Sequence, residues 1–401
     1  MDTFLRDARA TYVAANAGTL RWMLDRPRRH GAFVDTKVNA LTLADYTAAD
    51  GWRGPDVTFG WIQGRALEAI VTHARFFETE DPDLTERLDA AGKALYAALA
   101  DLVAGDGHAY FAYDAAMRPV FPDPDGRLQP QVPGDDLFTF SDTFVRKGLV
   151  SAAARYAPKD LDSRIAALLE VVRAIEEDRF VSDERQRIDR DALARDRRDY
   201  GPRMILLGAA AMLREIGQVD ASVFGERFTA HVLATNQRSD GSLADIPGED
   251  VCNPGHAIEF AGFGFGALAE GSAHRDRLVD VLRASARLGF HGPGIALRVF
   301  HETGLPAAPW YPWWPLPEAI RAGALAWQHT GDPRDLAIWR QAHEAFFRHF
   351  WRGTPPLAYQ TLTQDGPADF VPATPDLDPG YHTGLSLLGA IGVIDAMAER
   401  G

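Results

Sequence analysis

The sequence has a single cysteine, Cys252, among its 401 residues. One cysteine excludes an intramolecular disulfide and any cysteine-based metal cluster. No His/Asn pattern accompanies it that would indicate a thiol nucleophile, so we interpret it as a small buried side chain. No apolar run approaches the roughly 20 residues that a membrane-spanning helix requires. The first residues lack the charged-then-apolar order of a signal peptide, and we expect a cytoplasmic location.

Positive charge is also scarce, because 42 Lys and Arg residues face 56 Asp and Glu residues, a net charge of −14. That balance argues against nucleic acid or an anionic membrane as a partner. The apolar content of 46% and charged content of 24% are typical of a soluble globular protein. There is no Ser/Gly-rich linker and no break in composition. We therefore predict a single domain over residues 1–401, present as a monomer or homodimer.

Apolar residues recur at helical spacing through most of the chain, and strand candidates are few. One of those candidates is 110–113, which could belong to a small hairpin. The Gly-, Pro- and Asp-rich stretch 106–136 reads as a loop region that could shape a pocket mouth. The stretch 355–379 is proline-rich and aperiodic. The charged tract 183–198 is expected to be a solvated face or an exposed loop. Periodicity alone predicts an all-α fold, with helices over 3–25, 57–78, 84–104, 141–156, 162–177, 203–217, 222–236, 275–289, 317–331, 333–352 and 384–399.

The stretch Asn253-Pro254-Gly255-His256-Ala257-Ile258-Glu259-Phe260 is the strongest candidate for chemistry. Asn-Pro-Gly indicates a turn, and the small and apolar residues from Ile258 onward read as a buried helix. The turn would then place His256 and Glu259 three residues apart on one helix face. Histidine suits proton transfer, because its charge changes near neutral pH. The alternative is a core histidine beside a helix cap, with Glu259 as a first-turn carboxylate favoured by the helix dipole.

Three further motifs occur in an order that makes the set informative. Trp61-Ile62-Gln63-Gly64-Arg65 precedes the His256 stretch, and Trp313-Trp314-Pro315-Leu316-Pro317-Glu318-Ala319 and Gly380-Tyr381-His382 follow it. Together the four stretches resemble the motifs of the N-acylglucosamine 2-epimerase family, and they span most of the chain.

That resemblance implies an (α/α)6 barrel with small β-hairpins in its rim loops. It also implies that His256 and His382 are the catalytic residues, that Arg65 anchors the substrate, and that Glu259 and Glu318 are pocket carboxylates. Two acid/base groups would exchange the proton on C2 of a sugar through an enediolate. A guanidinium could steady the enediolate oxygens without a metal or other cofactor. No metal-ligand spacing is present, because His256 and Glu259 lack the second His of a zinc helix.

Clustered aromatic residues fit a sugar substrate. Trp310, Tyr311, Trp313 and Trp314 lie within five positions of one another, and Trp61 belongs to the first motif. Tryptophan rings can stack on sugar rings, so we place Trp61, Trp313 and Trp314 among the substrate-binding residues. Core packing is the alternative for each ring, and a structural ion pair is the alternative for Arg65. Glu318, which follows Pro317, could equally be a carboxylate at a helix start.

The sequence departs from the family at one place. The family has a further His-x-x-Glu on a helix in the middle of the chain, where this sequence has Ile205 and Gly208. The change removes two polar groups and puts both assistance to ring opening and the usual substrate in doubt.

Four functions remain open. The first is a C2 epimerase of a free or N-acylated monosaccharide or of a reducing-end sugar. The second is an aldose–ketose isomerase of mannose or lyxose type, which passes through the same enediolate. The third is a glycan-binding or glycan-cleaving relative, although the spacing of the acidic residues indicates no pair of carboxylates for glycoside hydrolysis. The fourth is a non-catalytic scaffold.

Overall fold

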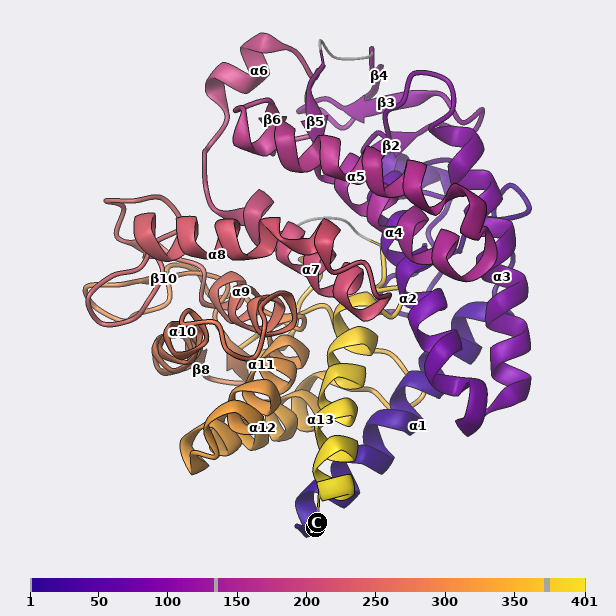
Figure 1. Ribbon diagram of the computed structural model, residues 1–401. Coiled ribbons are helices and arrows are strands. Elements are labelled where there is room, and N and C mark those ends of the chain that lie inside the picture. Colours follow the sequence, from indigo (N-terminus) through magenta and orange to yellow (C-terminus); the bar gives the residue numbers. More distant parts are fainter. Residues whose placement is uncertain (1, 133–135, 371–375, 401) are drawn as a thin grey trace. The chain divides into compact units, whose positions relative to one another are not determined.

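The computed structural model describes residues 2–132, 136–370 and 376–400, and these are mostly helical (Figure 1). The chain divides into two compact units. The first unit comprises Met1–Trp22, Asp199–Ala373 and His382–Gly401, and the second comprises Met23–Arg198 and Thr374–Tyr381. The single domain expected from the sequence stays a prediction. None of the described helices is both long and apolar enough to cross a membrane.

The first unit is built around α9 and α11. Helix α9 packs against α7, α10 and α11, and α11 also packs against α12 and α13. Helix α9 is buried almost all the way round, as expected for a helix enclosed by others. The helices of this unit are α7 (Gly201–Glu215), α8 (Phe224–Thr235), α9 (Pro254–Ala267), α10 (Arg275–Gly289), α11 (Pro315–Thr330), α12 (Pro333–Ala345) and α13 (Ser386–Arg400), together with most of α1 (Thr3–Asp25).

The short strands of the first unit form three small sheets, ordered β10-β7, β8-β9 and β11-β12-β13, and all their pairings are antiparallel. Each strand has only two or three residues, and all of them lie in the connections between helices. The strands are β7 (Val251–Cys252), β8 (Phe290–His291), β9 (Gly294–Ile295), β10 (Val299–Phe300), β11 (Tyr311–Pro312), β12 (Thr361–Thr363) and β13 (Gly366–Pro367).

The second unit is built around α2 (Gly60–Glu80) and α4 (Phe140–Tyr156). Helix α2 packs against α3 (Pro82–Leu102) and α4, and α4 packs against α5 (Leu161–Glu176). Helix α3 begins where the sequence favours it, because Asp81 caps the amide of Leu84 at 3.1 Å and Pro82 follows. A four-stranded sheet runs β1 (Thr58–Phe59), β2 (Ala112–Tyr113), β3 (Pro119–Pro122) and β4 (Leu128–Pro130), and β5 (Phe138–Thr139) pairs in parallel with β6 (Phe180–Val181).

The predicted helices are found within a few residues, but two of them end or begin irregularly. The helix expected over 333–352 is α12 followed by a π-helical turn, Phe346–Phe350. The helix expected from 384 is preceded by another π-helical turn, Tyr381–Leu385, which carries His382. The charged tract 183–198 is not entirely a solvated loop, because it contains α6 (Arg190–Arg195) and the buried Glu184. The strand candidate at 110–113 is confirmed in part as β2.

Candidate active site

The His256 stretch forms the first turn of α9. Asn253 is the N-cap residue, and its side-chain oxygen accepts the backbone N–H of His256 at 3.1 Å. Pro254 fills the first helical position, where a missing N–H costs nothing. The prediction that a separate turn precedes the helix is wrong, because the helix already includes Pro254 and Gly255. His256 is half-buried on a helix whose other residues are almost all buried.

Gly255 is required for a close approach. A Cβ atom built on it would lie 2.7 Å from the Trp314 ring and 2.8 Å from Pro315, closer than any real Cβ contact. The absence of a side chain therefore lets the start of α11 pack directly on the start of α9. His256 benefits from this approach, because its ring centroid lies 5.3 Å from that of Trp314.

Glu259, Glu318 and His382 form a buried group in the first unit, which we call the carboxylate–imidazole cluster. The Nδ1 atom of His382 lies 3.0 Å from Oε1 of Glu318, at hydrogen-bond distance, and 3.8 Å from Oε1 of Glu259. Glu259 lies on α9, Glu318 on α11, and His382 on the π-helical turn before α13. The three side chains are 2%, 1% and 7% exposed, so water screens their interactions weakly.

Electrostatics favour the ionised form of Glu318. Burial by itself would raise the pKa of Glu318, but the Arg321 guanidinium and the hydrogen bond from His382 outweigh it and lower that pKa. Glu318 is therefore an acceptor, and the proton of their hydrogen bond belongs to Nδ1 of His382. The neutral imidazole then carries its lone pair on Nε2.

Arg321 lies three residues after Glu318 on α11, and its side chain passes close to glycines of two neighbouring helices. Its guanidinium pairs with Oε2 of Glu318 and lies 4.3 Å over the Phe263 ring. A Cβ on Gly262 of α9 would meet Arg321 at 3.1 Å, and one on Gly389 of α13 would meet it at 3.0 Å. Both glycines therefore make room for a side chain that neutralises one of the two buried carboxylates.

The tryptophans of the second motif line the same cluster. The Trp314 ring lies 5.5 Å from the His382 imidazole, and the Trp313 ring lies 6.3 Å from it. The imidazole rings of both predicted catalytic histidines thus lie next to the same Trp314 ring. The distance between the two imidazole centroids therefore cannot exceed the sum of their distances to the Trp314 centroid. Trp310 differs from its neighbours, because it stacks on Phe370 at 4.5 Å. The structure therefore brings together His256, Glu259, Trp313, Trp314, Glu318 and His382.

The Trp-x-Gln-Gly-Arg motif lies on the first two turns of α2, in the second unit, and two of its residues are structural. The buried Gln63 side chain makes two hydrogen bonds to the backbone of Val34, at 2.9 and 3.0 Å. A Cβ on Gly64 would lie 2.5 Å from the backbone of Phe144, and one on Gly148 would lie 2.5 Å from the Gly64 carbonyl. Gly64 and Gly148 therefore let α2 and α4 cross closely.

Trp61 and Arg65 are the half-buried members of that motif, and they contact each other. The Arg65 guanidinium lies 4.1 Å from the Phe144 ring centroid, 5.0 Å from Trp61 and 5.1 Å from Tyr381. Three aromatic faces hold the cation in place, as cation–π contacts do. This arrangement leaves the planar guanidinium oriented by packing, which suits a group that steadies an oxyanion.

A buried ion pair adjoins Arg65 in the second unit. The Lys147 ammonium lies 2.9 Å from Glu68 and donates to the Tyr381 hydroxyl, also at 2.9 Å. Burial raises the pKa of Tyr381 to about 12, with Lys147 opposing that rise. Tyr381 is the first residue of the π-helical turn Tyr381–Leu385 and immediately precedes His382 in the sequence. No motif singled out Lys147 or Glu68 beforehand.

Helix α7 is apolar at the two positions where the sequence departs from the family. Ile205 is 5% exposed, and Gly208 is also buried. Tyr200, just before α7, is 3% exposed and packs edge-on against Phe260 of α9. Its hydroxyl is buried without a hydrogen-bond partner among the described residues. Burial and nearby carboxylates, Glu259 among them, raise the pKa of Tyr200 well above its usual value, so it is a neutral donor.

The carboxylate–imidazole cluster also meets one geometric requirement of a metal site. Its members each offer one ligand atom, and these atoms lie within 4.8 Å of one another. A divalent cation would compete with Arg321 for Glu318, and it would require Nδ1 of His382 to lose its proton. The expectation that the protein needs no metal stays a prediction.

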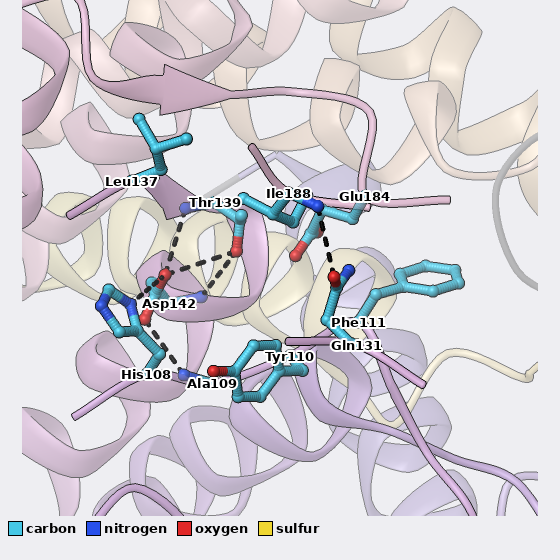
Figure 2. Close-up of a pocket in the computed structure, with 10 residues that line it drawn as sticks. All are labelled: His108, Ala109, Tyr110, Phe111, Gln131, Leu137, Thr139, Asp142, Glu184 and Ile188. Carbon is cyan, nitrogen blue, oxygen red and sulfur yellow. Dashed lines mark hydrogen bonds and ion pairs between the residues drawn. The ribbon is translucent and has the colours of Figure 1, made fainter. Parts of the chain in front are cut away.

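A second group of titratable residues lies in the second unit, around a small cavity (Figure 2). His108 lies 3.3 Å from Asp142, and the hydrogen bond to that carboxylate raises the pKa of His108. Burial raises the pKa of Glu184 to about 7, against hydrogen bonds from Thr139 and Ser141. The cavity has a volume of about 10 Å³, enough for a single water, so it is not a candidate active site.

The sequence matches no family model and no curated protein. Solved structures do match. Cellobiose 2-epimerase from Bacillus thermoamylovorans B4167 has a TM-score of 0.74 at 14% identity, covering 98% of this chain and 100% of that chain. Cellobiose 2-epimerase from Spirochaeta thermophila DSM 6192 has a TM-score of 0.71 at 14% identity, covering 98% of each chain. A D-mannose isomerase has a TM-score of 0.70 at 11% identity, again covering 98% of each.

At identities this low, the likeness establishes the fold. The chain therefore has the fold of the N-acylglucosamine 2-epimerase family and related sugar isomerases, the (α/α)6 barrel predicted by the resemblance of its four motifs.

Proposed function

We propose that this protein is a sugar isomerase that epimerises C2 of a free or N-acylated monosaccharide or of a reducing-end sugar. The observation that carries the proposal is the His382 imidazole, whose Nδ1 is bonded to a buried carboxylate 3.0 Å away. Such a partner holds the imidazole in the tautomer with a basic Nε2 and stabilises the imidazolium that forms on proton uptake. The fold shared with the cellobiose 2-epimerases and the D-mannose isomerase supports the same reaction class.

The proton transfer needs two bases. One imidazole, His256 or His382, removes the C2 proton and leaves an enediolate, and the other delivers a proton to the opposite face. Both imidazoles contact the Trp314 ring, which offers a flat apolar surface to a sugar. Arg65 is proposed as the cation for the enediolate oxygens, with Trp61 beside it.

Tyr200 is proposed as a further contact to the substrate. Its buried hydroxyl lacks a partner among the described residues, and a sugar hydroxyl could accept its proton. Ile205 and Gly208 provide neither an imidazole nor a carboxylate on α7, whereas the Tyr200 phenol, just before α7, is a buried hydrogen-bond donor.

An aldose–ketose isomerase is the second candidate, because a D-mannose isomerase shares the fold. It differs only in the carbon that receives the proton, which is C1 instead of C2. Glycan cleavage is less well supported. Glycosidases place two carboxyl groups on either side of the scissile bond. Here Glu259 and Glu318 both face one nitrogen of His382, and the lowered pKa of Glu318 makes it a poor general acid.

The test is an incubation in deuterated water with cellobiose, mannose, glucose, lyxose and N-acetylated hexosamines, followed by NMR. Epimerisation puts deuterium on C2 of the epimeric aldose, whereas isomerisation puts it on C1 of the ketose that forms. We expect His256→Asn and His382→Asn to abolish interconversion and His349→Asn, an exposed histidine, to leave it unchanged. Interconversion that survives in a folded His256→Asn/His382→Asn double variant would sink the two-base mechanism. Glycan cleavage by His256→Ala at the parental rate would favour a hydrolase.

A further inference from the structure

An arginine-rich cavity lies in the first unit, and none of its lining residues belongs to the candidate active site. Its volume is about 500 Å³, within the range of small-molecule pockets. The loop after α8, one face of α10 and the first turn of α12 enclose it (these helices are labelled in Figure 1). Five of its eleven lining residues are arginines, against two aspartates: Arg238, Arg277, Arg283, Arg287 and Arg334. Such a concentration of positive charge is unusual in a chain of net charge −14.

Two of the five arginines are held by neutral groups. Arg277 donates from Nε and Nη2 to the Gln237 side-chain oxygen, at 2.8 and 2.5 Å, and from Nη2 to the Leu233 carbonyl at 2.7 Å. Arg238 donates to the backbone carbonyl of Glu249, and its buried Nε has no acceptor among the described residues. Amide and carbonyl oxygens fix the direction of a guanidinium without cancelling its charge, so both cations are oriented in advance.

The other three arginines are balanced by carboxylates. Arg283 makes a two-pronged contact with Asp335, at 2.8 Å on each side, and it also pairs with Asp332 at 3.0 Å. Arg334 pairs with Asp332 at 2.6 Å. Arg287 pairs at 3.2 Å with Asp240, which His301 also approaches. These pairs hold the wall of the cavity in shape. Arg238 and Arg277 are the two cavity arginines that pair with no carboxylate among the described residues, and Asp280 is the second carboxylate of the lining.

We propose that this cavity is a second binding site, for a small molecule that carries a phosphomonoester group. Arginine forks match the oxygens of a phosphoryl group, and a dianion gains most from two cations that lack carboxylate partners. A cavity of about 500 Å³ is far larger than a phosphate ion, so the bound molecule has room for an organic portion of sugar size. The proposal is independent of the reaction at the carboxylate–imidazole cluster.

Calorimetric titration of the full chain at low salt, with inorganic phosphate and with a hexose monophosphate, tests this site. Both probes should bind, the hexose monophosphate more tightly, and Arg277→Gln and Arg238→Gln should each weaken binding about tenfold or more, the effect of losing a charge-assisted hydrogen bond. Arg298→Gln removes an exposed arginine outside the cavity and should leave binding unchanged. Added sodium chloride should weaken binding.

The proposal is overturned if neither probe binds at millimolar concentration, or if the Arg277→Gln/Arg238→Gln double variant binds as tightly as the parent. Inorganic phosphate binding as tightly as the hexose monophosphate would overturn the organic portion of the proposal. If the glutamine variants do not fold, Arg277→Lys keeps the charge but loses the fork, and it should bind several-fold more weakly. Phosphate should also raise the thermal unfolding midpoint of the parent chain more than chloride at equal ionic strength.

Discussion

The hydrogen bond between Glu318 and His382 offers the sharpest test of the proposed mechanism. Glu318→Gln keeps the shape of the side chain but removes its charge. The 3.0 Å contact to Nδ1 then loses a charge-assisted hydrogen bond, worth about 1.5–3 kcal/mol. If that stabilisation serves the imidazolium formed during proton transfer, kcat should fall about 10- to 150-fold.

Glu259→Gln is the matched control, because it makes the same chemical change 3.8 Å from the same nitrogen, beyond hydrogen-bond distance. We expect its kcat to fall less than that of Glu318→Gln. The assay is the rate of deuterium incorporation at C2 of the best substrate, measured at saturation. Unfolding in urea must accompany it, because Glu318→Gln also removes the carboxylate that pairs with Arg321.

A Glu259→Gln variant that loses as much activity as Glu318→Gln, with both folded, would refute this reasoning. The contact to Nδ1 would then not be what sets the state of the imidazole. A Glu318→Gln variant with unchanged kcat would refute it more directly.

Four further predictions concern stability, substrate contacts and metal dependence. The pKa of Glu184 is raised to about 7 in the folded protein, so the folded state binds its proton more tightly than the unfolded state. Its contribution to the free energy of unfolding is fully present below the unfolded pKa of about 4.5 and is lost as pH rises to 7, by up to about 3 kcal/mol. Urea unfolding of Glu184→Gln should lack that decline. Lys147→Met should destabilise the fold by about 3–5 kcal/mol because it removes the cation that balances the buried carboxylate of Glu68. The double variant Lys147→Met/Glu68→Leu should recover most of that loss in the same unfolding assay. Tyr200→Phe should raise KM several-fold and leave unfolding unchanged or slightly stabilised, since the hydroxyl has no partner to lose among the described residues, and an unchanged KM would remove Tyr200 from the site. Activity measured after EDTA treatment should be unchanged, and loss with recovery on adding a divalent cation would assign a metal to the carboxylate–imidazole cluster.

Much of the fold could be predicted from the sequence, because the helices are long and strongly periodic. Apolar residues at helical spacing place α3, α5 and α10 within a few residues of their observed bounds. The π-helical turns were missed, since one extra residue in a turn leaves no mark in an apolar pattern. The start of α9 was placed too late, because Asn-Pro-Gly fits a free turn and a capped helix N-terminus equally well.

The site could be predicted only where a motif marked it. Glu318 and His382 are 64 residues apart in the chain, yet they share a hydrogen bond that neither local sequence indicates. Lys147 was missed because its partner, Glu68, is distant in the chain and periodicity does not specify such pairs. Arg321 was missed although its partner, Glu318, lies only three residues earlier on α11. The Trp-x-Gln-Gly-Arg motif contains residues with two different roles. Gln63 and Gly64 are needed for packing, and Trp61 and Arg65 are the candidates for substrate binding.

The π-helical turn at Tyr381–Leu385 sets how this protein can tolerate insertions and deletions. An α-helix advances about 100° per residue, so deleting one residue that follows His382 in this turn would restore regular α spacing and rotate the imidazole by about that angle relative to α13. The ring would leave Glu318 although no residue of the cluster had changed. Length at this point of the chain is therefore as tightly constrained as the identity of the histidine itself.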